Sequence, residues 1–272
     1  MGQIEQLSSA STAETLAYLG RRPYDNVYVQ WLIETRQAGH ASIALWRDGA
    51  AIAGVCYYGL QIVPSADDEV GVAAFAERAR RARAARMIVG PRTAVEYFWS
   101  TARDFMSPPA AIRTSQPVYS LERSTLRFSR NDADVSRVTP AEVDEIVPHS
   151  ADMIAGEVGL DPRRSNPDFR GRTARIVAAG WWWRFRVDGR LAFMCNVGSA
   201  TEHTAQLQGV WTPPAMRHQG SATRALGAIC DHLLDQYPTL CLYVNGYNAS
   251  AIALYERVGF VRAGEFQTLL FP

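Results

Sequence analysis

A segment near the end of the chain joins a strand-like run to a helix-like run through a turn that contains glycine. It spans residues 208–222 and reads QGVWTPPAMRHQGSA. The first backbone N–H groups of a helix have no partner inside the helix, so a loop that points several of them the same way can bind an anion. Gly220 has no side chain to keep the anion away. We therefore expect a phosphate-binding loop here.

A second segment follows at residues 248–260, NASAIALYERVGF, where a predicted helix ends at Gly259 and runs into a strand. Together the two segments resemble the signatures of the GNAT superfamily of acyl-CoA-dependent N-acyltransferases. The loop signature, Arg/Gln-x-x-Gly-x-Gly/Ala, is met by residues 217–222. The second signature, Asn-x-x-Ala-x-x-Leu-Tyr-x-x-x-Gly-Phe, is met at every fixed position. Residues 157–162 and 242–245 further resemble a group of two-part bacterial GNAT proteins with a degenerate N-terminal half.

The resemblance implies an α/β fold with a mixed sheet and two GNAT-like domains, a degenerate one at residues 1–125 and an N-acetyltransferase domain at residues 126–272. Apolar periodicity and turn residues predict the same order of elements in both halves. The first half is expected to hold helices over 11–19, 24–36, 67–83 and 91–102 and strands over 41–47, 50–58, 87–89 and 117–121. The second is expected to hold helices over 141–158, 168–179, 221–236 and 249–258 and strands over 135–138, 183–187, 190–197, 204–212, 240–245 and 263–271. Polar, arginine-rich residues 122–134 are the predicted linker.

Local signals fix several boundaries. Asp48-Gly49 predicts a type I′ hairpin turn, and a second hairpin is expected about Asp188-Gly189. Thr139 and Glu142 form a predicted capping box with proline at the first helical position.

The first half departs from the GNAT signature where its own phosphate loop would open a helix. Residues 63–70 carry Asp67, Asp68 and Glu69 at this point. Three carboxylates repel a pyrophosphate, so we expect the first half to bind no CoA. Carboxylates at a helix N-terminus are favourable by ~0.3–1 kcal/mol each, and these three are expected to satisfy the donors that a phosphate would otherwise satisfy.

The resemblance also implies roles for particular residues. A bulged strand end and the phosphate loop would bind acyl-CoA through Val210, Thr212, Arg217, His218, Gln219, Gly220, Ser221 and Ala222. Asn248 would bind the pantetheine arm or cap the following helix. Tyr255 would protonate the departing thiolate, or else be a core tyrosine; its ordinary pKa of about 10 keeps it protonated at neutral pH.

A general base is less defined. Gln206 stands near the position where some family members have a carboxylate, and glutamine cannot take a proton. Glu157 is the candidate for binding or deprotonating the amine, with Glu202, His203 or a water chain as alternatives. The tryptophans at 181–183 are interpreted as core and domain packing, or as a wall of the acceptor pocket.

Composition excludes several classes of protein. A net charge of +1 provides no global field for nucleic acid or an anionic membrane, and no apolar stretch is long enough to span one. All 28 basic residues are arginine, which excludes a Walker A loop and a lysine Schiff base. The four cysteines lack metal-ligand spacing, so no metal is expected. The arginine cluster at 78–86 is interpreted as a solvated helix face. A cytoplasmic location is expected.

The sequence thus predicts an enzyme that transfers acetyl from acetyl-CoA to a small-molecule or peptide amine, with no nucleic-acid or membrane partner. The first half is expected to cover the acceptor cleft or to set the geometry of a homo-oligomer. A tandem enzyme that modifies a small aminated thiol or an antibiotic is a related alternative. A non-catalytic acyl-CoA sensor is the alternative from another class.

Overall fold

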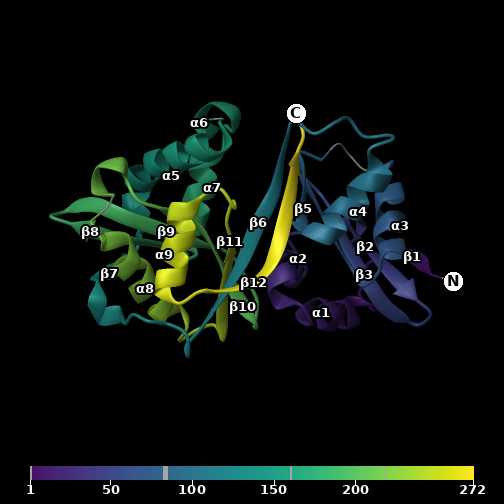
Figure 1. Ribbon diagram of the computed structural model, residues 1–272, viewed down its shortest axis with the longest axis horizontal. Helices are drawn as coiled ribbons and strands as arrows, with labels where there is room; N and C mark the ends of the chain where they lie inside the picture. Colours follow the sequence, from purple (N-terminus) through teal and green to yellow (C-terminus); the bar gives the residue numbers. More distant parts are fainter. Residues whose placement is uncertain (1, 82–84, 160, 218) are drawn as a thin grey trace.

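The computed structural model describes residues 2–81, 85–159, 161–217 and 219–272. Their strands form one twelve-stranded mixed sheet in the order β1-β2-β3-β4-β5-β12-β6-β11-β10-β9-β8-β7 (Figure 1). The elements of the first half are β1 (Gln3–Gln6), α1 (Thr12–Gly20), α2 (Pro23–Glu34), β2 (Ile43–Asp48), β3 (Ala51–Tyr58), β4 (Gln61–Ala66), α3 (Glu69–Ala79), β5 (Met87–Pro91), α4 (Arg92–Ala102) and β6 (Ala111–Glu122).

The second half repeats this order with an additional helical segment after its first strand. Its elements are β7 (Val135–Arg137), α5 (Val143–Val158), α6 (Pro162–Ser165), α7 (Phe169–Ala178), β8 (Trp182–Val187), β9 (Arg190–Ala200), β10 (Thr204–Trp211), α8 (Ser221–Leu233), β11 (Thr239–Tyr243), α9 (Ala249–Val258) and β12 (Val261–Leu270). Short 3-10 turns lie at His40–Ser42, Arg130–Asp132, Pro140–Glu142 and Pro214–Met216. The α/β fold expected from the sequence is confirmed.

The two halves exchange their last strands. β12, from the second half, pairs antiparallel with β5 and with β6, both from the first half. β6 in turn pairs antiparallel with β11 of the second half. In Figure 1 the yellow β12 accordingly runs between β5 and β6, at the centre of the molecule. The division proposed after residue 125 would therefore cut through one sheet, because each half completes the other.

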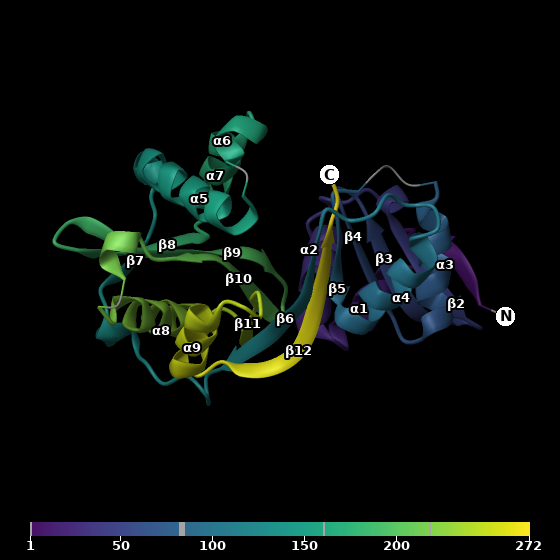
Figure 2. The same cartoon turned by 45° about the horizontal axis from the view of Figure 1, so that its top comes forward.

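Helices cover both faces of the sheet. In the second half, α5 and α7 pack on one face through Ile146 and Val177, whereas α8 packs on the other through Leu226 and Ile229 (Figure 2). In the first half, α1 and α2 lie over one apolar cluster and α3 and α4 over a second. The buried end of β12, from Phe266 to Leu269, has neighbours on both faces, as expected of a central strand.

Two local predictions need correction, and a third is confirmed. β4 was not predicted, because Pro64 lies inside it; β4 pairs with β5 only at Gln61 and Ile62, so the proline follows the end of that ladder. The turn after β2 has a positive φ at Gly49 alone, which suits a type II′ turn and not type I′. Asp188 and Gly189 both have positive φ, as a type I′ turn requires.

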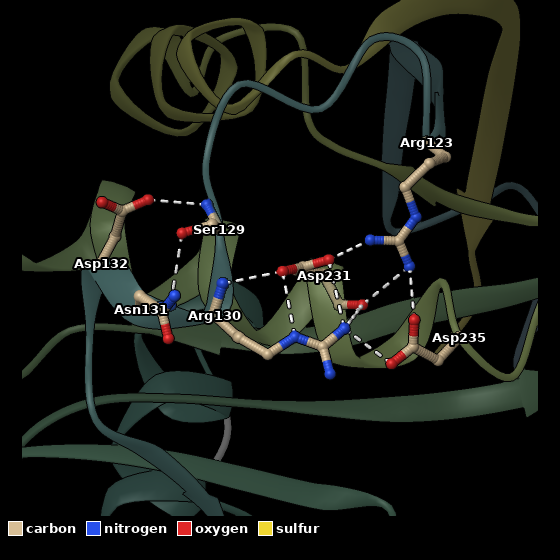
Figure 3. A network of polar contacts seen from close by, with 7 residues as sticks. All are labelled: Arg123, Ser129, Arg130, Asn131, Asp132, Asp231 and Asp235. Carbon is tan, nitrogen blue, oxygen red and sulfur yellow. Dashed lines mark hydrogen bonds and ion pairs between the residues drawn. The ribbon is translucent and has the colours of Figure 1, made fainter.

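The predicted linker is bound to α8 along much of its length. The carboxylate of Asp231, which is 7% exposed, accepts hydrogen bonds from the side chain of Arg123 and from the backbone and side chain of Arg130 (Figure 3). Asp235 accepts from the same two arginines at 2.8 and 2.6 Å. The connection between the halves is thus held by charge-assisted hydrogen bonds and is not a free tether.

Candidate functional site

β10 separates from its parallel neighbour at the centre of the second half. It pairs with β11 only from Thr204 to Gln206, and its register against β9 shifts again between Gln208 and Trp211. Gly209, inside this irregular stretch, has a φ of 62°. The bulge expected at residues 210–212 therefore begins within β10. Backbone groups beyond Gln206 do not continue the ladder with β11, which leaves them available to a ligand between the strands.

The predicted phosphate loop connects this strand to α8. Gly220 precedes the helix with a φ of 72°, and a Cβ built on it would meet nothing within 4 Å. No side chain of the described residues caps the first turn of α8. Arg217 is exposed, and its Nε donates to the carbonyl of Thr212 at 3.1 Å. The first N–H groups of α8 therefore have no side-chain acceptor among the described residues, as an anion site requires.

The other loop residues have structural partners. Gln219 donates to the carbonyl of Ala215 at 3.3 Å, which closes the loop on itself. Ser221 is buried and Ala222 packs against the apolar core of this half. His218 lies outside the described residues.

The corresponding helix of the first half, α3, is capped from within. Asp68 accepts a hydrogen bond from the N–H of Gly71 at 2.6 Å. Asp67 instead forms ion pairs with Arg21 and Arg22, at 2.7 and 3.2 Å. The expectation that all three carboxylates of this segment serve the helix N-terminus is thus corrected, because the ion pairs draw Asp67 toward α1.

Asn248 caps the N-terminus of α9, which is one of the two roles expected from the sequence. Its Oδ1 accepts from the N–H of Ala251 at 3.2 Å and from the hydroxyl of Ser250 at 3.0 Å. The side chain is exposed at the surface. Because Oδ1 accepts both of these hydrogen bonds, a contact with pantetheine would have to use mainly the amide nitrogen of Asn248 as a donor.

Tyr255 lies on α9, between the rings of Tyr119 and Phe260 at centroid distances of 6.4 and 5.8 Å. It is 6% exposed. Burial raises the pKa of its hydroxyl well above the ordinary value, and the nearby Cys195 and Glu157 add to the shift. The phenol therefore keeps its proton across the physiological pH range, whether it serves the core or the chemistry.

Glu157 stands at the end of α5, close to the point where β10 and β11 part. Its Oε1 accepts from Arg113 at 3.3 Å and from Asn245, just after β11, at 3.4 Å. The negative charge of Glu157 also contributes to the raised pKa of Tyr255. The two residues that the sequence nominates for catalysis thus both lie in the second half, Glu157 at the end of α5 and Tyr255 on α9.

The alternative bases are placed elsewhere. Glu202 and His203 precede β10, whereas the phosphate loop follows its end, about 25 Å along the strand. Gln206 is buried, and its Oε1 accepts from Gln208 at 3.0 Å.

Helix α2 of the first half packs against strands β9 and β10 of the second half. The ring of Trp31, on α2, lies 6.0 Å from that of Trp181. Trp182 and Trp183 are buried in different apolar clusters of the second half. The core and packing interpretation of the three tryptophans therefore accounts for their positions.

Sequence reasoning missed a polar network beside Glu157. Gln116 is 1% exposed and donates to Asn245 at 3.0 Å, while Thr268 donates to Gln116 at 2.6 Å. Gln116 and Asn245 are 129 positions apart. A polar residue at the end of an apolar predicted strand, as at Asn245, is the one local signal that could have pointed to it.

Within the described residues, no cluster of histidine, cysteine, aspartate and glutamate could hold a metal ion. None of the helices described there combines the length and the apolar character needed to cross a membrane.

Many kinds of protein bind phosphate at the start of a helix, so we compared the sequence with known families. Residues 155–260 match the acetyltransferase (GNAT) family. The second half is a GNAT acetyltransferase domain. The enzyme class expected from the sequence, a GNAT-type acetyltransferase, is thereby confirmed. Residues 42–146 match a domain of unknown function (DUF4081), which fits a degenerate first half.

Several solved structures that are similar to this chain are of GNAT proteins. A GNAT-family acetyltransferase from Colwellia psychrerythraea is 14% identical, with a TM-score of 0.59 over 99% of this chain and 100% of that one. A tandem GNAT protein from the clavulanic acid biosynthesis pathway is 13% identical, with a TM-score of 0.58 over 99% and 98%. A GCN5-related N-acetyltransferase from Kribbella flavida is 16% identical, with a TM-score of 0.58 over 94% and 95%. At these identities the shared property is the fold. No curated protein matches the chain.

Proposed function

We propose that this acetyltransferase transfers the acetyl group of acetyl-CoA to a primary amine, by direct attack of the amine in a ternary complex. The observation that carries the proposal is the uncapped first turn of α8, which follows a strand that has parted from its parallel neighbour. Such a pair of features supplies N–H donors for a pyrophosphate and free backbone groups for the arm attached to it.

The loop residues would hold acetyl-CoA, which supplies the activated acyl group. The N–H groups from Gln219 to Ala222 would donate to the pyrophosphate, and the exposed Arg217 would pair with a phosphate. Backbone groups near Val210 and Thr212 would bind the pantetheine arm. Asn248 would add a contact through its amide nitrogen, because its oxygen is used by the cap.

Tyr255 and Glu157 would handle the protons. A tyrosine whose pKa is raised by burial stays protonated, so Tyr255 would donate its proton to the departing sulfur. Glu157 would bind the amine and help to remove its proton. The part of its side chain that remains exposed, 48%, leaves access for such a ligand.

The amine would approach from the side covered by the first half, where α2 lies over β9 and β10. In this arrangement the first half would limit the size of the acceptor and exclude water from the amine. This is the cleft-covering role expected from the sequence. The acceptor class would be a small-molecule or peptide amine.

The test is a thiol-release assay with the full-length protein, acetyl-CoA and a panel of amines that includes small metabolites, peptides and aminoglycosides. The proposal expects release above background hydrolysis with at least one amine, together with an acetylated product of the matching mass. Binding of acetyl-CoA without thiol release over the whole panel would favour the sensor alternative.

A further inference from the structure

We propose that Arg113 and Gln116, both on β6 of the first half, are positioning residues of the amine site in the second half, acting through Glu157 and Asn245. This inference rests on the proposed function. It assigns the first half a part in the active site beyond covering it.

The first line of support is a chain of hydrogen bonds with a fixed direction. A carboxylate only accepts, so the nitrogen of Asn245 donates to Glu157 at 3.4 Å and its Oδ1 is left to accept from the amide nitrogen of Gln116 at 3.0 Å. Oε1 of Gln116 in turn accepts from the hydroxyl of Thr268 at 2.6 Å. All three donors belong to buried residues, where an unmade hydrogen bond is costly. The chain of bonds therefore holds Asn245 with its nitrogen toward the carboxylate.

Arg113 also donates hydrogen bonds to Glu157. Its side chain is 16% exposed, and its guanidinium donates to Oε1 of Glu157 and to the backbone carbonyl of the same residue, both at 3.3 Å. A carboxylate in the last turn of a helix is unfavourable, because the helix dipole is negative there. The arginine offsets this cost and satisfies a terminal carbonyl of α5.

Both donors reach the same carboxylate oxygen. Arg113 and Asn245 bind Oε1 of Glu157, so within the described part of the chain Oε2 is the oxygen left for another donor. A carboxylate held by one oxygen presents the other in a defined direction. An amine N–H is a donor that such an oxygen would accept.

The hydrogen bonds between β6 and the residues around Glu157 form because the two halves exchange their last strands. β6 lies beside β11 because the two halves share a sheet, and this pairing places Gln116 next to Asn245. In a separate second half, Glu157 would lose Arg113 and Asn245 would lose the partner that orients it. The degenerate half is therefore a working part of the enzyme in this account.

The test compares steady-state kinetics of full-length variants, with the panel amine that the wild type turns over fastest. Arg113→Met should raise KM for the amine by about 10–100-fold, as expected for a lost hydrogen bond to a charged group of about 1.5–3 kcal/mol. KM for acetyl-CoA should stay within about twofold of the wild-type value. Arg113→Lys, which keeps the charge, should recover part of the loss. Arg92→Met, which breaks an exposed pair on α4, is the matched control and should change neither constant.

A double-mutant cycle separates positioning from stability. In the Glu157→Gln background, Arg113→Met should have little further effect on KM for the amine, because it acts through that carboxylate. Additive effects, or an unchanged amine KM in a folded Arg113→Met protein, would overturn this inference and leave the proposed function intact. Absence of any activity in the wild type would instead overturn the proposed function, and this inference with it.

Discussion

The carboxylate of Asp68 accepts a 2.6 Å hydrogen bond from the N–H of Gly71, in the first turn of α3. Among the described residues, no side chain caps the first turn of α8, in the other half, in this way. The N-terminus of α3 is thus capped by a side chain of the protein, whereas the N–H groups at the start of α8 lack such a partner in the described part of the chain.

Replacement of this cap should affect stability and not ligand binding. Asp68→Ala should lower the free energy of unfolding by about 1 kcal/mol, the usual effect of losing an N-cap. Urea denaturation measures the change, with Asp67→Ala as the control that leaves the cap intact. A variant that gains a second CoA site would contradict the view that the first half is degenerate beyond this one residue.

A carboxylate placed at the open helix start should weaken CoA binding. Gly220→Asp puts a negative charge beside the expected pyrophosphate, so the Kd for CoA should rise by about 10-fold or more, equivalent to 1.4 kcal/mol. Gly189→Asp is the matched control, because Gly189 has a φ of 73° and equally open surroundings. Equal CoA affinity in both variants, measured by calorimetry, would place the phosphates elsewhere.

Removal of the Tyr255 hydroxyl should slow catalysis. Tyr255→Phe keeps the ring contacts with Tyr119 and Phe260 and should lower kcat by about 10²–10⁴-fold, the usual range for general acid catalysis. The Kd for CoA should be nearly unchanged. Tyr119→Phe, which removes a hydroxyl bonded to Glu256, is the control and should keep most of its activity. Full activity of Tyr255→Phe in a chemistry-limited assay would make Tyr255 a core residue.

The linker contacts of Asp231 should stabilise the protein in a pH-dependent way. Burial alone would raise the pKa of Asp231, but hydrogen bonds from Arg130 and Arg123 outweigh it, so the pKa lies below its ordinary 3.8. A lowered pKa in the folded state stabilises the protein above pH 3.8, and this contribution disappears as the pH falls through the folded-state value.

Asp231→Asn should therefore reduce the free energy of unfolding by about 1–3 kcal/mol at pH 7, since both arginines are partly exposed. Thermal melts at pH 7 and near pH 3 provide the measurement. The gap between wild type and variant should narrow at the lower pH. A gap that is constant over this range would show that the charge of Asp231 contributes nothing to stability.

Local chemistry explains why so much of the fold follows from the sequence. The order of elements depends on short-range signals, such as the Thr139–Glu142 pair, in which Glu142 accepts from the N–H of Thr139 at 2.8 Å. The phosphate loop and the end of α9 at Gly259 likewise depend on glycine with positive φ. Such features are encoded within a few residues.

Long-range pairing was not predictable in this way. Nothing in residues 111–122 or 261–270 indicates that these strands cross between the halves, because an apolar strand fits many neighbours equally well. The Gln116–Asn245 contact depends on that crossing, so it was missed together with the role of Arg113. Glu157 was nominated as a reachable carboxylate at a helix end, because glutamine stands near the position where some family members have one, and its partners became apparent only in the fold.

The central claim is that one half of this protein binds acetyl-CoA and the other does not. Calorimetric titration of the full-length chain with CoA tests it most directly. The full chain is required because a fragment that ends at residue 125 would lack β12, which separates β5 from β6. The account predicts one site per chain, abolished or weakened in Gly220→Asp and retained in Asp68→Ala. Two equivalent sites per chain, or no binding at all, would contradict it.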